Sequence, residues 1–326
     1  MSRVLVTGGS GFIARHALPA LAAAGHEVHA VALRRTLPIS NVVWHTVNLL
    51  DPNQAVQLLA TVKPTHLLHF AWYAEHGEFW RSPLNLDWVA TSVSLFKSFV
   101  EIGGQRAVFA GTCGEYDWSE PAPLVEDQTP SNPQTLYGVC KNATRQVIQS
   151  YADVADVSVA WGRIFFLYGA DEHPKRLVPS ILNPLRNNEI AYVRCGNHVR
   201  DLLHVQDVAS AFVRLLESDV RGTVNIASGQ GVTLGDVARQ AAAVFGRPDL
   251  LKIDGQPPTP ENPGIIVADN SRLLNEVGWS PKYDLASGLE QVAGIDRSHT
   301  ELRQPAPHSR LHAGSQSGFR SEASVR

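Results

Sequence analysis

A glycine-rich turn near the N-terminus constrains the fold of this chain more than any other feature. Residues 7–14 read TGGSGFIA, and they join the apolar run Val4–Thr7 to the Ala- and Leu-rich run Phe12–Ala24. Glycines permit a tight strand-to-helix turn and let a phosphate approach the backbone, where the free N–H groups of the helix N-terminus attract it. Ala14 occupies the place of a third glycine. The pattern therefore indicates a dinucleotide-binding unit.

Strand-like runs alternate with helix-length segments over the first half of the chain. The strand candidates are Val4–Thr7, Val28–Leu33, Val42–Val47, His66–Phe70, Ala107–Ala110 and Val157–Trp161, and the helix candidates include Phe12–Ala24, Leu86–Ile102 and Tyr137–Tyr151. Strands separated by helices form parallel sheets. We predict an α/β fold, a Rossmann-like doubly wound parallel sheet with a smaller C-terminal α/β substrate lobe.

The second half of the chain changes character and suggests how the two parts divide. Proline-rich turns interrupt 171–184 and 256–263, while Thr223–Ile226 looks like a strand that rejoins the main sheet. We predict a dinucleotide domain at 1–168, rejoined by about 200–228, and a substrate-binding lobe at 169–199 and 229–295. Residues 296–326 are rich in Ser, Arg, His and Gln and predict a disordered tail.

Composition excludes several classes of partner. A formal net charge of -3 gives no reason to expect nucleic acid or an anionic membrane surface, and no apolar run approaches the ~18 residues of a membrane span. A strand-like run within a few residues of Met1 leaves no room for a signal peptide. Cys113, Cys140 and Cys195 lack CxxC spacing, and no metal-site spacing occurs. We expect a cytoplasmic protein with reduced thiols and no metal.

Tyr137 and Lys141 form the residue pair that most strongly indicates catalysis. Their four-residue spacing places both on one helix face. A lysine ammonium beside a phenol favours the phenolate and lowers the tyrosine pKa from ~10. Such a phenol exchanges a proton with a carbonyl or alcohol oxygen beside a nicotinamide. The alternative is a surface Tyr–Lys pair.

The end of the second strand candidate bears on the choice of dinucleotide. An NAD site usually has an acidic residue there, which binds the ribose 2′-hydroxyl. This chain has Arg34 and Arg35 instead, and guanidinium groups pair well with a 2′-phosphate. We expect NADP(H), with NAD(H) as the less favoured choice; the alternative is that both arginines are solvated loop charges.

Several ordered motifs carry a resemblance to a family. They are the glycine turn, His69-Phe-Ala71, the segment ending in Glu115-Tyr116, Tyr137/Lys141, Arg163-Ile-Phe-Phe-Leu-Tyr168-Gly169, Arg200-Asp-Leu-Leu-His204-Val-Gln-Asp207, Asn225-Ile-Ala-Ser-Gly229 and Val277-Gly-Trp-Ser-Pro281. Over about residues 3–295 the chain resembles extended short-chain dehydrogenases/reductases, specifically the nucleotide-sugar epimerase/dehydratase/reductase branch. The resemblance implies an enzyme that acts on a nucleotide-diphosphate sugar.

The resemblance also implies roles for individual residues. Thr112, four residues before Tyr116, joins Tyr137 and Lys141 as the catalytic set. It implies cofactor contacts from Thr7, Gly8, Gly11, Phe12, Ile13, Arg34, Arg35, Asn48, Leu49, Phe70, Ala71, Trp72, Tyr137 and Lys141. Substrate contacts are expected from His76, Cys113, Glu115, Arg176 and Arg200, with Arg200 pairing with the diphosphate or, alternatively, with Asp201 or Asp207. The helix candidates Leu86–Ile102 and Tyr137–Tyr151 imply a homodimer through a four-helix interface.

Departures from the family pattern narrow the expected reaction. Dehydratases of the family have an Asp-Glu pair after the catalytic threonine, whereas this chain has Cys113-Gly114. The cysteine and histidine of double epimerase-reductases are also absent from their usual places. We therefore expect an NADPH-dependent reductase of a keto nucleotide-sugar, such as a 4-keto-6-deoxyhexose. The alternatives are a nucleotide-sugar 4-epimerase with bound NAD, a reductase of a non-sugar carbonyl and a catalytically silent NADP(H)-sensing module.

Overall fold

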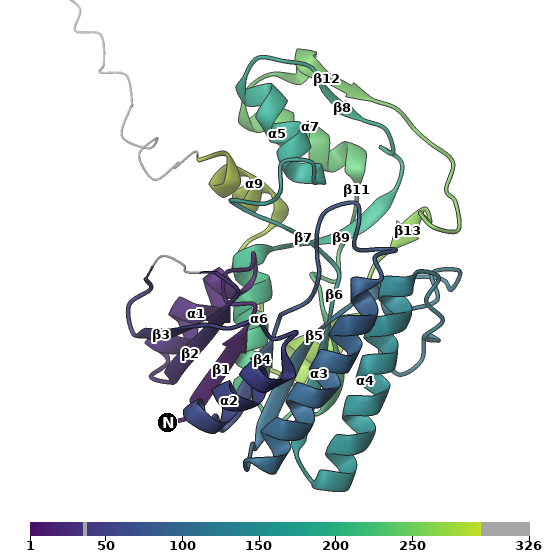
Figure 1. The fold of residues 1–326 in the computed structure, drawn as a ribbon. Helices are drawn as coiled ribbons and strands as arrows, with labels where there is room; N and C mark the ends of the chain where they lie inside the picture. The colour runs from purple at the N-terminus through teal and green to yellow at the C-terminus, as the bar shows by residue number, and fades with distance from the viewer. Residues whose placement is uncertain (35–37, 295–326) are drawn as a thin grey trace, which may run out of the picture.

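A seven-stranded parallel sheet organises the first part of the protein (Figure 1). The structure, a computed structural model, describes residues 1–34 and 38–294, so Arg35 and the expected disordered tail at 296–326 lie outside the described residues. The sheet has the order β10-β6-β5-β4-β1-β2-β3. Its strands are β1 (Arg3–Thr7), β2 (Glu27–Ala32), β3 (Val42–Thr46), β4 (His66–His69), β5 (Arg106–Thr112), β6 (Ser158–Ile164) and β10 (Gly222–Ile226). The predicted fold class is confirmed.

Helices cover both faces of the sheet, as its continuous apolar strands require. On one face α1 (Ala14–Ala23) and α6 (Val205–Glu217) pack over Val4 and Val6. On the other face α2 (Pro52–Val62), α3 (Leu84–Glu101) and α4 (Leu136–Ala155) pack over Leu5, Leu67 and Phe109. Alternate residues of β1 therefore belong to the two hydrophobic cores, one on each face of the sheet.

The C-terminal lobe has its own small sheets and core. Its strands are β7 (Phe166–Tyr168), β8 (Ala191–Val193), β9 (Val199–His204), β11 (Gly231–Thr233), β12 (Leu251–Ile253) and β13 (Ile265–Ile266); β9 pairs with β7, β11 and β13, and β8 pairs with β12. The lobe's helices are α5 (Leu177–Arg186), α7 (Leu234–Val244) and α9 (Leu285–Ala293), with a short 3-10 helix at Pro248–Leu250. Helix α8 (Ser271–Asn275) instead buries Leu273 in the core of the main sheet. Of the segment 200–228, α6 and β10 return to the main sheet, whereas β9 belongs to the lobe.

Two observed helices contain prolines at positions where the sequence pattern suggested a turn or a kink. We expected proline-rich turns through residue 184, but α5 includes Pro179 and Pro184. Pro179 lies in the first turn, where backbone N–H groups have no partner within the helix and a missing one costs little. α1 likewise runs through Pro19.

The strand order determines where a ligand can bind. The chain runs from β1 outward to β2 and β3, and then crosses back to place β4 on the other side of β1. Ligands of such sheets bind at the carboxyl ends of the strands beside this reversal. The glycine turn follows β1 and the segment Phe70–Trp72 follows β4, so both lie at that point.

Candidate active site

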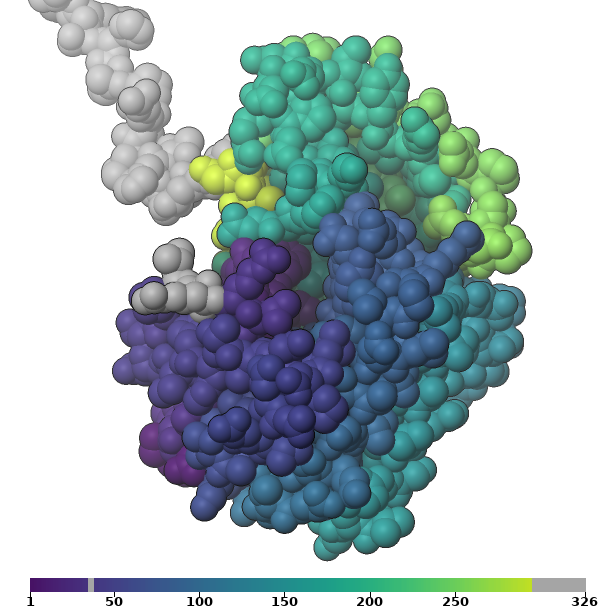
Figure 2. Space-filling view, in the orientation of Figure 1, coloured from purple at the N-terminus to yellow at the C-terminus, as the bar shows by residue number. Residues whose placement is uncertain are grey.

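A cavity of about 600 Å³ lies where the carboxyl ends of the sheet face the C-terminal lobe. The glycine turn, the segment after β4, the end of β5, helix α4 and the lobe all contribute lining residues. Figure 2 shows the N-terminal segments and the lobe on the two sides of the hollow between them. Predicted site residues in the lining are Gly8, Gly11, Phe12, Ile13, Phe70, Ala71, Trp72, Thr112, Cys113, Tyr137, Lys141, Arg176 and Arg200.

The glycine turn presents bare backbone to this cavity. Gly8 has φ +67°, and a Cβ atom there would lie 2.9 Å from the backbone nitrogen of Ala71. No side chain caps the N-terminus of α1, and its first turn contains no acidic residue. An uncapped helix N-terminus beside a backbone cradle suits a pyrophosphate. These residues therefore fit a nicotinamide dinucleotide.

Thr112, Tyr137 and Lys141 meet at the inner end of the cavity. Thr112 ends β5, and its Oγ1 accepts a hydrogen bond from the N–H of Gly114 at 3.2 Å. Tyr137 and Lys141 lie one turn apart on α4, and the Tyr137 hydroxyl hydrogen-bonds the Thr112 side chain. Because Gly114 supplies the hydrogen that Oγ1 accepts, the Thr112 hydroxyl keeps its own hydrogen for donation.

Lys141 is held by a carbonyl oxygen and an aromatic face. Its Nζ donates to the Ala110 carbonyl oxygen at 2.8 Å and lies 3.9 Å from the ring centroid of Trp72. Burial lowers the pKa of Lys141 to about 7, and the nearby Glu115 charge opposes this shift. The side chain is therefore poised to gain or lose a proton near neutral pH.

The expected lowering of the Tyr137 pKa is not what the structure gives. Burial raises the pKa of Tyr137, the hydrogen bond with Thr112 lowers it by a smaller amount, and Glu115 raises it further. The ammonium of Lys141 is directed instead to Ala110 and Trp72. In this arrangement Tyr137 favours the neutral phenol, so it must first lose its own proton before it can act as a base.

The loop after β4 surrounds Tyr137 with aromatic rings. Trp72, Phe79 and Trp80 each meet the Tyr137 ring nearly edge-on, with centroids 6.5, 4.9 and 5.7 Å away. His76, an expected substrate contact, does not line the cavity; its ring stacks on His173 at 5.0 Å. The loop thus acts through its aromatic members, which restrict where the phenol can point.

Glu115, another expected substrate contact, is buried beneath the cavity and not in its lining. Its carboxylate accepts hydrogen bonds from Thr112 N–H, Trp161 Nε1 and Arg163 Nε, each at 2.9 Å. The sequence places Glu115 next to the catalytic segment, but side-chain packing turns it toward β6. The structure thus places Glu115 behind the cavity wall, and the expected substrate contact stays a prediction.

Arg176 and Arg200 are the two arginines of the lining. Arg200 is buried and donates to the Val199 carbonyl oxygen at 2.8 Å and to Asn262 Oδ1. It pairs with neither Asp201, whose carboxylate accepts from Ser228 and Gly229, nor Asp207, whose carboxylate accepts from the backbone of Lys282 and Tyr283. Among the described residues neither arginine forms an ion pair with a carboxylate, and such guanidinium groups suit a diphosphate.

The remaining expected cofactor contacts lie outside the cavity lining. Thr7 is buried and accepts a hydrogen bond from Ala71 N–H at 3.2 Å, so it supports the turn from behind. Arg34 and Asn48 are exposed, and Leu49 lies in a separate groove between α2 and α3. Sequence reasoning also missed lining residues, namely Ser10, Phe79, Trp80, Trp118, Tyr168, Glu172, Glu261 and Asn262.

Over residues 1–34 and 38–294 no group of His, Cys, Asp or Glu side chains could hold a metal ion. Within those same ranges no helix is both long and apolar enough to cross a bilayer. Cys113, Cys140 and Cys195 are all free thiols.

The fold and cavity define a class of protein. A parallel doubly wound sheet with a glycine turn at its strand-order reversal, and a Tyr–Lys pair on the helix before β6, define a dinucleotide-dependent enzyme of the short-chain dehydrogenase/reductase type. The chain matches the NAD dependent epimerase/dehydratase family over residues 4–227, and it belongs to that family. The resemblance found in the sequence is confirmed.

Relatives and solved structures indicate which members of the family this chain resembles. The chain is 27% identical to a UDP-glucose 4-epimerase of Rhizobium meliloti, over 89% of this chain and 96% of that protein. It is 26% identical to a UDP-glucose 4-epimerase of Corynebacterium glutamicum, over 93% and 99%. The crystal structure of the Thermus thermophilus UDP-glucose 4-epimerase complex with NAD superposes with TM-score 0.78 at 25% identity, covering 90% of this chain and 98% of that chain.

These findings overturn the expected activity. We expected an NADPH-dependent reductase of a keto nucleotide-sugar, but the relatives are named 4-epimerases and the similar structure holds NAD. The prediction was wrong because it chose among reactions by the motifs that are absent. A reductase and a 4-epimerase share Thr112, Tyr137 and Lys141, so those residues do not separate the two.

Proposed function

We propose that this protein is a nucleotide-sugar 4-epimerase that works with a retained NAD. The observation that carries the proposal is that relatives named UDP-glucose 4-epimerase align with nearly the whole chain. Thr112, Tyr137 and Lys141 line the same cavity as the glycine turn, which supports the hydride and proton transfers that this reaction requires. We propose a uridine diphosphate sugar as the substrate class.

The reaction assigns one proton transfer to Tyr137. Inverting C4 of a sugar requires that its hydrogen leave as hydride and return on the opposite face, with a ketone in between. A bound nicotinamide supplies the hydride acceptor and donor. Tyr137 acts in its deprotonated form: the phenolate takes the proton of the C4 hydroxyl when the ketone forms, and the resulting phenol returns it when the alcohol is restored. Thr112 donates a hydrogen bond to the same oxygen.

Lys141 and the arginines complete the proposed set. Lys141 lies one helical turn from Tyr137, and its ammonium would stabilise the phenolate that is present before the first proton transfer and after the second. Arg176 and Arg200 hold the diphosphate, which leaves the sugar facing Tyr137. The aromatic rings of Phe79 and Trp80 exclude water from the reacting oxygen.

Retention of the dinucleotide is the property that separates an epimerase from a reductase. An epimerase returns the hydride it removed, so it needs no net supply of reduced cofactor. Leu33 and Arg34 follow β2, where many NAD sites have a carboxylate, so NAD and NADP must both be measured.

The test begins with the purified protein as isolated. We would denature it, identify the released nucleotide by mass spectrometry, and incubate native protein with UDP-galactose and UDP-glucose without added cofactor. We expect bound NAD and interconversion of the two sugars, followed by NMR. Conversion that consumes NADPH stoichiometrically would refute the proposal. Dinucleotide binding without turnover of a panel of UDP sugars would favour the sensing module instead.

A further inference from the structure

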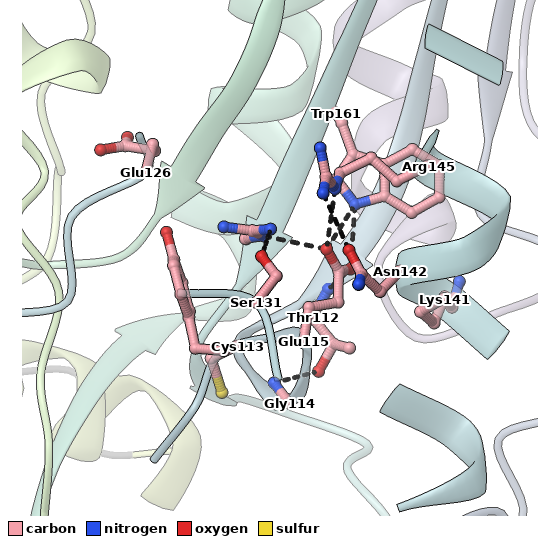
Figure 3. A network of polar contacts seen from close by, with 12 residues as sticks. Thr112, Cys113, Gly114, Glu115, Glu126, Ser131, Lys141, Asn142, Arg145 and Trp161 are labelled. Atoms are coloured by element: carbon pink, nitrogen blue, oxygen red, sulfur yellow. Dashed lines mark hydrogen bonds and ion pairs between the residues drawn. The ribbon is translucent and has the colours of Figure 1, made fainter. Parts of the chain in front are cut away.

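The turn that holds Thr112 rests on a buried carboxylate that lies outside the cavity lining. Glu115 is 0% exposed and ends the 3-10 helix η1 (Cys113–Glu115), which follows β5 directly. Figure 3 shows its carboxylate directed toward Trp161 of β6 and Arg145 of α4. The proposed chemistry does not use this buried acid, so its conformation needs another explanation.

Glu115 and Thr112 hold one another in a fixed geometry. The Glu115 carboxylate accepts from Thr112 N–H at 2.9 Å, and the Thr112 hydroxyl accepts from Gly114 N–H at 3.2 Å. This reciprocal pair is a capping box, in which each side chain accepts a hydrogen bond from a backbone N–H of the turn. Since the hydroxyl oxygen is held by Gly114, its hydrogen is directed to the Tyr137 side.

The residues around the Glu115 carboxylate supply hydrogen-bond donors and leave space for it. Trp161 Nε1 donates to Oε1 at 2.9 Å and Arg163 Nε donates to Oε2 at 2.9 Å, so Glu115 ties the end of β5 to β6. A Cβ atom at Gly111 would lie 2.6 Å from Glu115 Oε1 and would collide with Trp161. Glycine at position 111 therefore makes room for the carboxylate beside the strand that ends in Thr112.

The charges that face Glu115 come from the turn, from β6 and from α4. Arg163 of β6 pairs with it at 2.9 Å, and Arg145 of α4 lies 3.7 Å away. Lys141 and Tyr137 face it from α4, and the Cys113 thiol faces it from its own turn. The Glu115 charge raises the pKa of both Tyr137 and Lys141.

We propose that Glu115 is a positioning residue: it fixes the Thr112 hydroxyl beside Tyr137, and its negative charge acts on Tyr137 and Lys141 from beneath the cavity. The proposal rests on the proposed function for its turnover measurements. It differs from a merely structural role because it predicts a change in pH dependence. A carboxylate that only stabilised the fold would affect the amount of active enzyme, not the pH at which it works.

Glu115→Gln keeps the shape and removes the charge. Without the anion, the Lys141 ammonium loses an attraction and the Tyr137 phenolate loses a repulsion, so the pKa of each group falls. Both limbs of the kcat–pH profile should move to lower pH by on the order of one unit, the size expected for one charge at several ångströms in a protein interior. Unshifted limbs would overturn the electrostatic part.

Glu115→Asp tests the positioning part, because it keeps the charge on a shorter side chain. The carboxylate then cannot reach Thr112 N–H and Arg163 together. We expect kcat to fall by about 10- to 100-fold with little change in KM, and pH limbs near those of the wild type. A variant with wild-type kcat would overturn the positioning part.

Two further variants keep the test decisive if Glu115→Gln folds poorly. Arg145→Met removes a partner charge that does not touch Thr112, and it should move both limbs to higher pH, opposite to Glu115→Gln. Glu126→Gln is the matched control: Glu126 is a buried carboxylate that accepts from Asn225 N–H and not from Thr112. It should leave both limbs in place; the same shift in this control would overturn the assignment to Glu115.

A second measurement separates this proposal from the proposed function. The tyrosinate absorbance of wild type minus that of Tyr137→Phe follows the titration of Tyr137 without any turnover. If no UDP sugar is turned over, the proposed function fails, yet the Tyr137 titration should still shift to lower pH in Glu115→Gln. If turnover occurs and that titration does not shift, only the inference about Glu115 fails.

Discussion

Replacing Gly8 by alanine should both destabilise the protein and weaken dinucleotide binding. Gly8 has φ +67°, a conformation that costs a residue with a Cβ ~1–2 kcal/mol. The new Cβ would also lie 2.9 Å from Ala71 N, 3.0 Å from Ala71 Cα and 3.1 Å from the carbonyl carbon of Phe70. All three neighbours are backbone atoms, so relief requires the β1 and β4 ends to separate.

The magnitude follows from these two contributions. Overpacking of this kind costs ~1–3 kcal/mol, so Gly8→Ala should lose about 2–5 kcal/mol of unfolding free energy. Gly25→Ala is the matched control, since Gly25 has φ +85° and no atom of the described residues lies within 4 Å of a Cβ placed there. It should lose only the conformational ~1–2 kcal/mol.

Urea denaturation measures both variants against the wild type, with and without added NAD. Added NAD should stabilise Gly25→Ala as much as wild type but stabilise Gly8→Ala less, because only the latter disturbs the phosphate cradle. Equal losses for the two variants would refute the argument that Gly8 is required by the close approach of Ala71.

Three other predictions concern chemistry, pH and assembly. Tyr137→Phe should reduce turnover by ~100- to 10,000-fold while the copurified dinucleotide remains bound, and wild-type rates would exclude Tyr137 as the proton carrier. Burial lowers the pKa of His69 to about 3, so the unfolded chain, with a His pKa near 6.5, binds a proton that the folded protein does not between these values. The unfolding free energy should therefore fall as pH drops from about 6.5 toward 3, by up to on the order of 4 kcal/mol, and calorimetry of His69→Asn should show a shallower slope. Light scattering should give the mass of a homodimer, and a monomeric mass at working concentration would exclude the expected four-helix interface of α3 and α4.

The parallel sheet could be predicted because its signals are local. Six expected strands in the first half coincide with β1 to β6 to within a few residues, since each is a short apolar run bounded by turn residues. The lobe was harder to predict: β7, β8 and β11 have three residues each, too few to show a period. Pairing partners far apart in the chain stabilise them.

The same difference between local patterns and distant contacts decides which site residues could be predicted from the sequence. The glycine turn and the Tyr137/Lys141 spacing are local patterns, and both line the cavity. Glu115 was expected to contact substrate because it adjoins Thr112 in sequence, but its orientation depends on Trp161 and Arg163, more than forty residues away. The raised pKa of Tyr137 is likewise a result of burial that spacing alone does not reveal.

The chain leaves the main sheet for the lobe twice, after β6 and again after β10, two strands that lie side by side. Both lobe segments therefore start from neighbouring positions at one edge of the sheet. Sequence changes confined to these two segments can alter which sugar is admitted while the dinucleotide half keeps its geometry. A chimera carrying both lobe segments of another family member, grafted after β6 and after β10, should keep the dinucleotide and change its preferred substrate.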